Sequence, residues 1–240
     1  SFNLSKKDKK VKIGGIFYAK SKQQILYLDA DGPPSKNFSK NYQSGPLSFE
    51  YFLDGIKVIT NCGFGNNIST KAELLSRLTA SQSTLTINDT SITKFERNKL
   101  INRVFGNSIK NTFKTSEFKF TKNQNLIGCS VSHNGYEKDF NCIHKREVYL
   151  DSNNSSLNGI DHILKKSDGI PIRYCFRFHL NPDLSAVKTM SGNSVLIQIS
   201  KNKSLIFTVK DEHLEIEKSI YLGGKKILEN TCITISGNLV

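Results

Sequence analysis

The chain alternates between apolar and polar residues in short runs separated by turn residues, and almost no stretch keeps the helical period of about 3.6 residues. This pattern is typical of an antiparallel sandwich or barrel. We therefore predict an all-β fold, a large antiparallel multi-stranded β-sandwich with at most one or two short helices. The predicted strands are residues 17–19, 24–29, 47–53, 56–61, 83–88, 117–121, 125–133, 137–150, 172–180, 194–200, 205–210, 214–222 and 231–236.

Glycine-containing dipeptides mark the predicted turns. Asp54-Gly55 lies between two apolar runs and predicts a hairpin. Further turns are predicted at Asn134-Gly135, Asn158-Gly159, Asp168-Gly169 and Gly192-Asn193. Only residues 71–80 have helical spacing, with Leu74, Leu75 and Leu78 on one side, which predicts a single helix lying on the sandwich.

The length of 240 residues is sufficient for one domain with a full core. We expect a lysine-rich lead-in over residues 1–12 and the β-sandwich domain over residues 13–240. No apolar run approaches the ~18 residues of a membrane-spanning helix, so no span is predicted. The chain starts without Met and without a signal-type apolar core, and we expect it to be a fragment of a longer protein.

The chain carries 34 Lys and Arg against 21 Asp and Glu, a net charge of +13. Such a surplus favours polyanions, whether nucleic acid, an anionic membrane surface or an acidic polysaccharide. It is equally typical of an AT-rich genome, whose lysines form a solvated face. The basic residues near the start lack interleaved aromatics, which argues against a nucleic-acid arm.

Five widely spaced cysteines form no C-x-x-C pair, which is typical of buried small apolar residues rather than a zinc knuckle or disulfide framework. Dinucleotide-binding, P-loop and G-x-S-x-G signatures are also absent, which argues against nucleotide-driven chemistry.

Two predicted strands carry basic side chains. In residues 172–180, alternation places Arg173, Arg177 and His179 opposite an apolar face. These side chains could bind carboxylates or sulfates, or could pair with acids across the sheet. In residues 140–150, His144 and Arg146 lie within an apolar stripe, where they need partners or a cleft.

Short motifs follow one another in an order that resembles the C-terminal β domain of heparinase II/III-like polysaccharide lyases. They are residues 15–18, 28–34, 47–50, 54–55, 58–63, 83–90, 133–136, 144–150, 177–182 and 219–223, and they extend over nearly the whole chain.

The resemblance implies an upstream α/α toroid, absent from this chain, with substrate in the cleft between toroid and β domain. This chain would form one wall of a cleft for an acidic, uronate-containing polysaccharide, such as a glycosaminoglycan or alginate, cleaved by β-elimination. The isolated domain is not expected to be active alone. The alternative is a non-catalytic or structural β-sandwich that binds a polyanionic glycan. An odd cysteine count fits the cytoplasm, whereas access to polysaccharide fits a bacterial periplasm.

The resemblance also assigns candidate site residues. Gln82 stands where the family usually has a histidine, and glutamine neither titrates nor binds zinc well, so no catalytic residue is assigned. Asp89 and His133 lie nearest a possible divalent metal site, with zinc as the candidate ion. The candidate substrate-binding residues are the basic side chains of the two strands: Arg173, Arg177, His179, His144 and Arg146.

Overall fold

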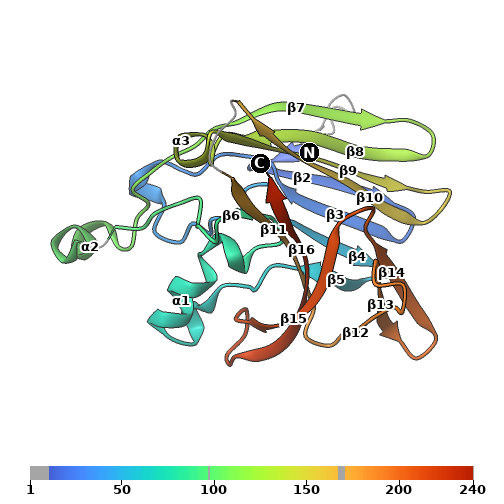
Figure 1. Ribbon diagram of the computed structural model, residues 1–240. Helices are drawn as coiled ribbons and strands as arrows, with labels where there is room; N and C mark the ends of the chain where they lie inside the picture. Colours follow the sequence, from blue (N-terminus) through green and yellow to red (C-terminus); the bar gives the residue numbers. More distant parts are fainter. Residues whose placement is uncertain (1–10, 97, 167–170, 240) are drawn as a thin grey trace, which may run out of the picture.

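The computed structural model describes residues 11–96, 98–166 and 171–239, and the strands in these ranges form three antiparallel sheets (Figure 1). The large sheet has the order β1-β2-β3-β4-β5-β11-β16-β15, with β6 pairing β11 beside this path. Its strands are β1 (Lys12–Ile13), β2 (Ile16–Ser21), β3 (Gln24–Asp29), β4 (Phe49–Leu53), β5 (Ile56–Thr60), β6 (Leu85–Ile87), β11 (Ile172–Leu180), β15 (His213–Tyr221) and β16 (Leu228–Leu239).

Two smaller sheets complete the fold. The second sheet has the order β10-β9-β8-β7, and the third has the order β12-β13-β14. Their strands are β7 (Thr115–Lys122), β8 (Leu126–His133), β9 (Cys142–Asp151), β10 (Ser156–Lys165), β12 (Ser185–Lys188), β13 (Ser194–Ser200) and β14 (Lys203–Thr208). The predicted all-β sandwich is confirmed.

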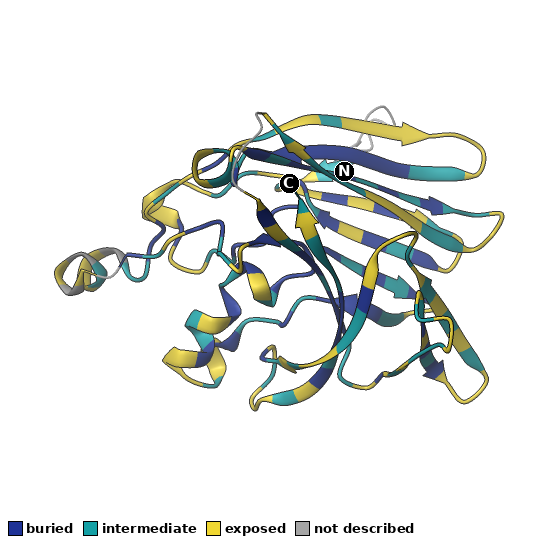
Figure 2. Ribbon diagram, viewed as in Figure 1, coloured by how far each residue is buried: buried dark blue, intermediate teal, exposed yellow. Residues whose placement is uncertain are grey.

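The core lies between the inner faces of the sheets, because alternate residues of each strand point inward. Figure 2 shows this alternation as bands of buried and exposed residues along the strands. Phe17, Leu26 and Phe49 of the large sheet are buried in the same cluster as Val131 and Leu150 of the second sheet. In β11, Arg173 is exposed while Phe176 and Phe178 are buried, as the predicted alternation requires, but Cys175 and His179 on the face of Arg173 are buried as well.

The hairpin at Asp54-Gly55 is confirmed. Asp54 has φ 52° and Gly55 has φ 78°. Two successive positive φ angles are the geometry of a type I′ turn, which matches the twist of the strands on either side.

The helices are short. They are α1 (Thr70–Ser76), α2 (Lys99–Phe105) and α3 (Glu137–Phe140), with 3-10 turns η1 (Lys36–Phe38), η2 (Gly65–Asn67) and η3 (Thr79–Ser81). Ser69 caps α1 by accepting a hydrogen bond from the Ala72 N–H. The helix predicted over residues 71–80 ends early, because Leu78 has ψ 150° and is extended.

Several sequence predictions were wrong in detail. The strand predicted over residues 137–150 begins only at Cys142, because Asn141 at φ 54° separates α3 from β9. Asn158-Gly159 lies inside β10 and not at a turn, and the predicted strands omitted β10 and β12. The Asp168-Gly169 turn lies outside the described residues. So do residues 1–10 of the predicted lead-in, whose Lys12 begins β1.

A long segment leaves the large sheet between β5 and β7. This excursion segment, residues 61–114, carries η2, α1, η3 and α2, and it returns once to the sheet as β6 beside β11. It contains Gln82 and Asp89. None of the helices in the described part of the chain has the length and apolar character needed to cross a membrane.

Candidate functional site

A buried ionic cluster joins β8, β9 and β10. The Arg146 guanidinium contacts Asp161 in bidentate fashion, with Nε 2.7 Å from Oδ1 and Nη2 3.0 Å from Oδ2. His144 Nε2 lies 2.7 Å from the same Oδ1. His144 and Arg146 are fully buried in the sandwich. His144 and Arg146 were predicted to need partners inside an apolar stripe, and both contact Asp161. The sequence analysis had not singled out Asp161.

The hydrogen bonds fix the protonation of both histidines in this cluster. The Gly135 N–H donates to His133 Nδ1 at 3.0 Å, so the proton of the neutral His133 ring is on Nε2. That Nε2 lies 3.2 Å from His144 Nδ1, which must accept. His144 therefore carries its proton on Nε2 and donates it to Asp161. The chain of donors and acceptors is complete when both imidazoles are neutral.

Burial and the neighbouring charges set the pKa values. Desolvation by burial lowers the pKa of His144, and the hydrogen bond to Asp161 only partly opposes it. Burial and the nearby His144 and Arg146 lower the pKa of His133 further. Burial alone would raise the pKa of Asp161, but Arg146 and His144 hold it below its ordinary value. The cluster is thus a carboxylate and a guanidinium with two neutral imidazoles.

Arg146 also reaches across the sandwich to the excursion segment. Its Nη1 donates to the carbonyl oxygens of Leu47 at 2.7 Å and of Ser83 at 2.9 Å. On the other side, the Ser83 hydroxyl accepts from the His179 N–H at 2.9 Å and donates to the Thr60 carbonyl at 2.6 Å. Ser83 is therefore hydrogen-bonded to Arg146 of the second sheet and also to Thr60 and His179 of the large sheet.

Gln82, the neighbour of Ser83, is 2% exposed. Its Nε2 donates to the Ser76 carbonyl at 2.8 Å, which ties η3 to the end of α1. Gln82 therefore links η3 to α1, and its side chain is shielded from solvent.

His179 has the same kind of role. Its Nε2 donates to the Ala80 carbonyl at 3.0 Å, and its Nδ1 lies 3.1 Å from the Ser219 hydroxyl. Burial lowers its pKa to about 4. The imidazole is therefore neutral, and it fastens the excursion segment to β11 and β15.

The two arginines of β11 face outward and are bridged by Asp89. Arg173 Nη1 lies 3.6 Å and Arg177 Nη2 3.4 Å from the Asp89 carboxylate. Arg177 also donates to the Thr86 hydroxyl at 2.5 Å. Of the two interpretations left open by the sequence, pairing with acids across the sheet is the one that the geometry favours. Asp89 thus pairs with both guanidiniums, while Arg173 remains 63% exposed.

The two predicted metal ligands do not lie in one site. Asp89 is engaged with the β11 arginines, while both ring nitrogens of the buried His133 are used by Gly135 and His144. Across the described ranges, no three His, Cys, Asp or Glu side chains converge to hold a metal ion. The residues present do not fit the zinc site that the resemblance implied.

A groove in the excursion segment was missed by the sequence analysis. The groove, of about 840 Å³, lies between α1, residues 90–96 and α2 and is called the α1–α2 groove below. Leu74, Leu78 and Phe95 form its apolar part, and the lysines Lys71 and Lys110 are among its lining residues. One signal was available in advance, since the excursion segment carries eight Lys and Arg against three Asp and Glu.

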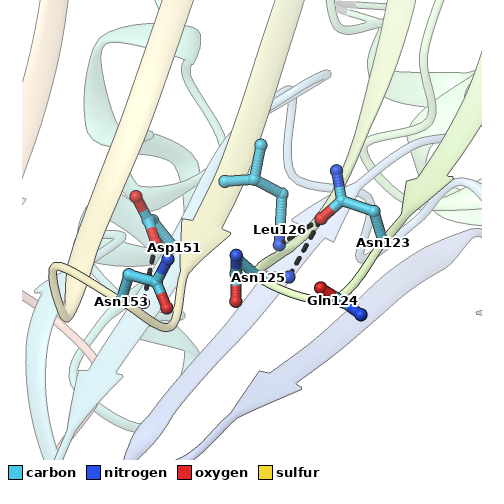
Figure 3. A pocket seen from close by; sticks show the side chains of 6 residues that line it. All are labelled: Asn123, Gln124, Asn125, Leu126, Asp151 and Asn153. Atoms are coloured by element: carbon cyan, nitrogen blue, oxygen red, sulfur yellow. Dashed lines mark hydrogen bonds between the residues drawn. The ribbon is translucent and has the colours of Figure 1, made fainter.

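A second hollow, of about 540 Å³, lies where the β7–β8 and β9–β10 hairpins meet (Figure 3). It is lined by Asn123, Gln124, Asn125, Leu126, Asp151 and Asn153. The side-chain oxygen Oδ1 of Asn123 accepts from the backbone N–H groups of Asn125 and Leu126, so this side chain stabilises its own turn. None of the predicted site residues contributes to this hollow.

Comparison with known proteins identifies the family. The sequence profile described as "Heparinase II/III-like, C-terminal" matches residues 3–239. No curated protein matches the chain in sequence.

Solved structures share the fold at low identity. Heparan sulfate lyase HepC from Pedobacter heparinus superimposes with a TM-score of 0.70 at 17% identity, covering 94% of this chain and 34% of the lyase. A HepC mutant from the same organism gives 0.71 at 16% identity, covering 94% and 33%. A heparinase III structure gives 0.65 at 15% identity, covering 93% and 33%. The chain spans about one third of these proteins. Because the family match extends over nearly all its residues, the chain belongs to the heparinase II/III-like, C-terminal family.

Proposed function

We propose that this chain is the β domain of a polysaccharide lyase and forms one wall of a cleft for an acidic, uronate-containing polysaccharide. Family membership supports lyase chemistry as the class. The solved relatives are named heparan sulfate lyase and heparinase III, so a glycosaminoglycan is the first substrate to test. Since each relative is about three times as long as this chain, a second domain of the same protein is part of the proposal.

The observation that carries the proposal is the α1–α2 groove, which is lined by both apolar side chains and lysines. Leu74, Leu78 and Phe95 offer a surface for the C–H faces of sugar rings. Lys71 is exposed and offers an ammonium group to a carboxylate or sulfate. Lys94 is also exposed, and its ammonium group, now paired with Asp139 at 2.9 Å, would exchange this partner for the ligand. Along the chain, η3 and then Gln82 follow α1, and Gln82 stands at the position where, by the resemblance, the family usually carries histidine.

The groove can supply one part of a β-elimination. A lysine ammonium that neutralises the uronate carboxylate acidifies the C5 proton. The C5–H bond and the C4–O4 bond then break, a C4–C5 double bond forms, and a proton is delivered to O4. The groove is lined by no histidine, tyrosine or cysteine among the described residues, and His133, His144 and His179 are buried with their ring nitrogens engaged. The acidic lining residue Glu96 is buried and paired with Lys36 and Lys110, so we assign the base and the acid to the second domain.

Charge reversal in the groove tests the proposal. Lys71→Glu combined with Lys94→Glu should weaken heparan sulfate binding by the complete protein roughly tenfold and reduce its salt dependence. Lys201→Glu, at the exposed β13–β14 turn, is the matched control. Unchanged binding in the groove variant would remove this groove from the site. The lyase part requires ultraviolet absorbance from unsaturated uronate products, and a complete protein that releases none from heparan sulfate, chondroitin sulfate or alginate would contradict it.

A second candidate function is non-catalytic binding of a polyanionic glycan. It is favoured by Gln82, which is buried and cannot titrate where the family usually has histidine. Salt-sensitive binding of heparan sulfate without any unsaturated product would support this candidate over the lyase.

A further inference from the structure

Tyr18, Tyr27 and Phe52 form an aromatic strip on the outer side of the large sheet, across β2, β3 and β4. The ring centroids of Tyr18 and Tyr27 are 5.3 Å apart, and those of Tyr27 and Phe52 are 6.0 Å apart. Tyr18 is 42% and Tyr27 39% exposed. The three rings therefore form a connected surface that faces solvent.

This strip is not part of the core. The residues next to these rings along the strands point inward and are buried, among them Ala19 beside Tyr18, and Leu26 and Leu28 beside Tyr27. Cross-strand aromatic pairs do stabilise a sheet modestly. Contiguous exposed aromatic surface on a soluble protein is nevertheless uncommon, and it is typical of a contact site.

Cationic groups flank the strip on the same side of the sheet. Lys57 lies opposite Phe52, with Nζ 5.2 Å from the ring centroid and 2.8 Å from Glu50. At the other end of that row, Lys20 lies opposite Ile25, is exposed, and forms no ion pair with the residues that the structure describes. This row runs beside that of Tyr18 and Tyr27, in which Glu50 lies opposite Tyr27. Since Lys57 is paired with Glu50, Lys20 is the cation beside the rings that a ligand would meet without displacing an acidic side chain of the described residues.

We propose that the aromatic strip is a second glycan-binding surface of this domain, on which sugar rings of an acidic polysaccharide stack. The face of an aromatic ring is electronegative and attracts the C–H groups of a pyranose, while the tyrosine hydroxyls offer hydrogen bonds to its oxygens. Lys20 complements a carboxylate or sulfate group. The identity of the ligand as an acidic glycan rests on the proposed function.

The strip is separate from the α1–α2 groove. The groove belongs to the excursion segment, whereas the strip belongs to the first four strands of the large sheet. Between the strip and β11, Thr60 and His179 are paired and buried. The two surfaces can therefore be removed independently, and a chain long enough to reach both would gain affinity from each.

The test uses binding of heparan sulfate polysaccharide by the chain and by the complete protein. Tyr18→Ala combined with Tyr27→Ala should weaken binding roughly two- to tenfold for each ring removed. Phe38→Ala, which removes an 81% exposed ring from η1, should leave binding unchanged. The chain contains no tryptophan, so Tyr27→Trp introduces one fluorophore whose emission should shift when heparan sulfate is added.

Three results would overturn the inference. The first is unchanged affinity of a folded double tyrosine variant. The second is unchanged emission from the Tyr27→Trp variant when glycan binds to it. A loss of affinity in the alanine variant would then reflect misfolding. The third is an indole shielded from quenchers in the complete protein without glycan, because a protein segment would then cover the strip together with the exposed Ile13 and Ile16. Failure of the wild-type chain and complete protein to bind any acidic glycan would instead contradict the proposed function itself.

Discussion

Arg146 and Ser83 are 63 positions apart in the chain, yet the guanidinium Nη1 donates to the Ser83 carbonyl at 2.9 Å. The same guanidinium is locked against Asp161 in the core. Through this contact the second sheet determines where the segment between η3 and β6 lies, including Ser83 and the neighbouring Gln82. Arg146, a candidate site residue in the sequence analysis, thus holds part of the excursion segment in place.

Replacing Arg146 with Met should therefore destabilise the protein strongly. The change leaves the Asp161 carboxylate buried without its guanidinium and removes donors from two buried carbonyls, a loss of about 3–5 kcal/mol in the free energy of unfolding. Urea unfolding monitored by circular dichroism measures it. Arg173→Met, at a side chain that is 63% exposed, is the control and should change stability by about 0.5 kcal/mol or less. Similar losses in both variants would contradict the buried cluster.

The neutral histidines make the fold sensitive to mild acid. His133, His144 and His179 have lowered pKa values in the folded state, whereas the unfolded chain binds their protons near pH 6.5. Below that pH the unfolded state carries more protons, so stability falls as pH falls, by up to about 1.4 kcal/mol per pH unit for each histidine. For His179 the loss ends near its folded pKa of about 4.

Asp161 adds to the acid sensitivity at lower pH. Its folded pKa is lowered from 3.8, so its contribution is complete above that value and is lost as pH falls through the folded pKa. Urea midpoints between about pH 7 and pH 4 should decline accordingly. His213→Gln, at a ring that is 66% exposed, is the control variant. A flat profile over this interval would mean that the three buried rings are already charged in the fold.

The sequence predicts features that depend on neighbouring residues better than contacts between residues far apart in the chain. Alternation within a strand is local, so the inward position of His144 and Arg146 and the outward position of Arg173 followed from period two alone. Their partners did not, because Asp161 lies on β10, a strand that the prediction omitted after assigning a turn to Asn158-Gly159. The α1–α2 groove depends on how the excursion segment folds back over the sheet, and only its excess of lysine and arginine was visible beforehand.

Gln82 offers a charge test of its structural role. In Gln82→Glu the ionised carboxylate would face the Ser76 carbonyl that the amide now donates to, in a site that is 2% exposed. The variant should lose about 2–4 kcal/mol at neutral pH, since a buried charge would lack a partner. Lowering the pH should restore part of this loss relative to wild type, because the protonated acid can donate. Thermal unfolding at two pH values measures the difference, with Gln124→Glu in the exposed β7–β8 turn as the control. A variant as stable as wild type would place the Gln82 side chain in solvent.

The five cysteines, all buried as free thiols, provide the last test. Burial raises the pKa of Cys62 to about 11 and that of Cys129 to about 12, so neither thiol is both ionised and accessible near neutral pH. Native protein should therefore react with an aromatic disulfide reagent only at the rate of unfolding, and all five thiols should react at once in urea. Ser200→Cys, at an exposed strand end, supplies a fast-reacting reference within the same fold. If a wild-type thiol reacted as fast as this reference, at least one cysteine would be exposed, and the packing of the strand that carries it would be different from that described above.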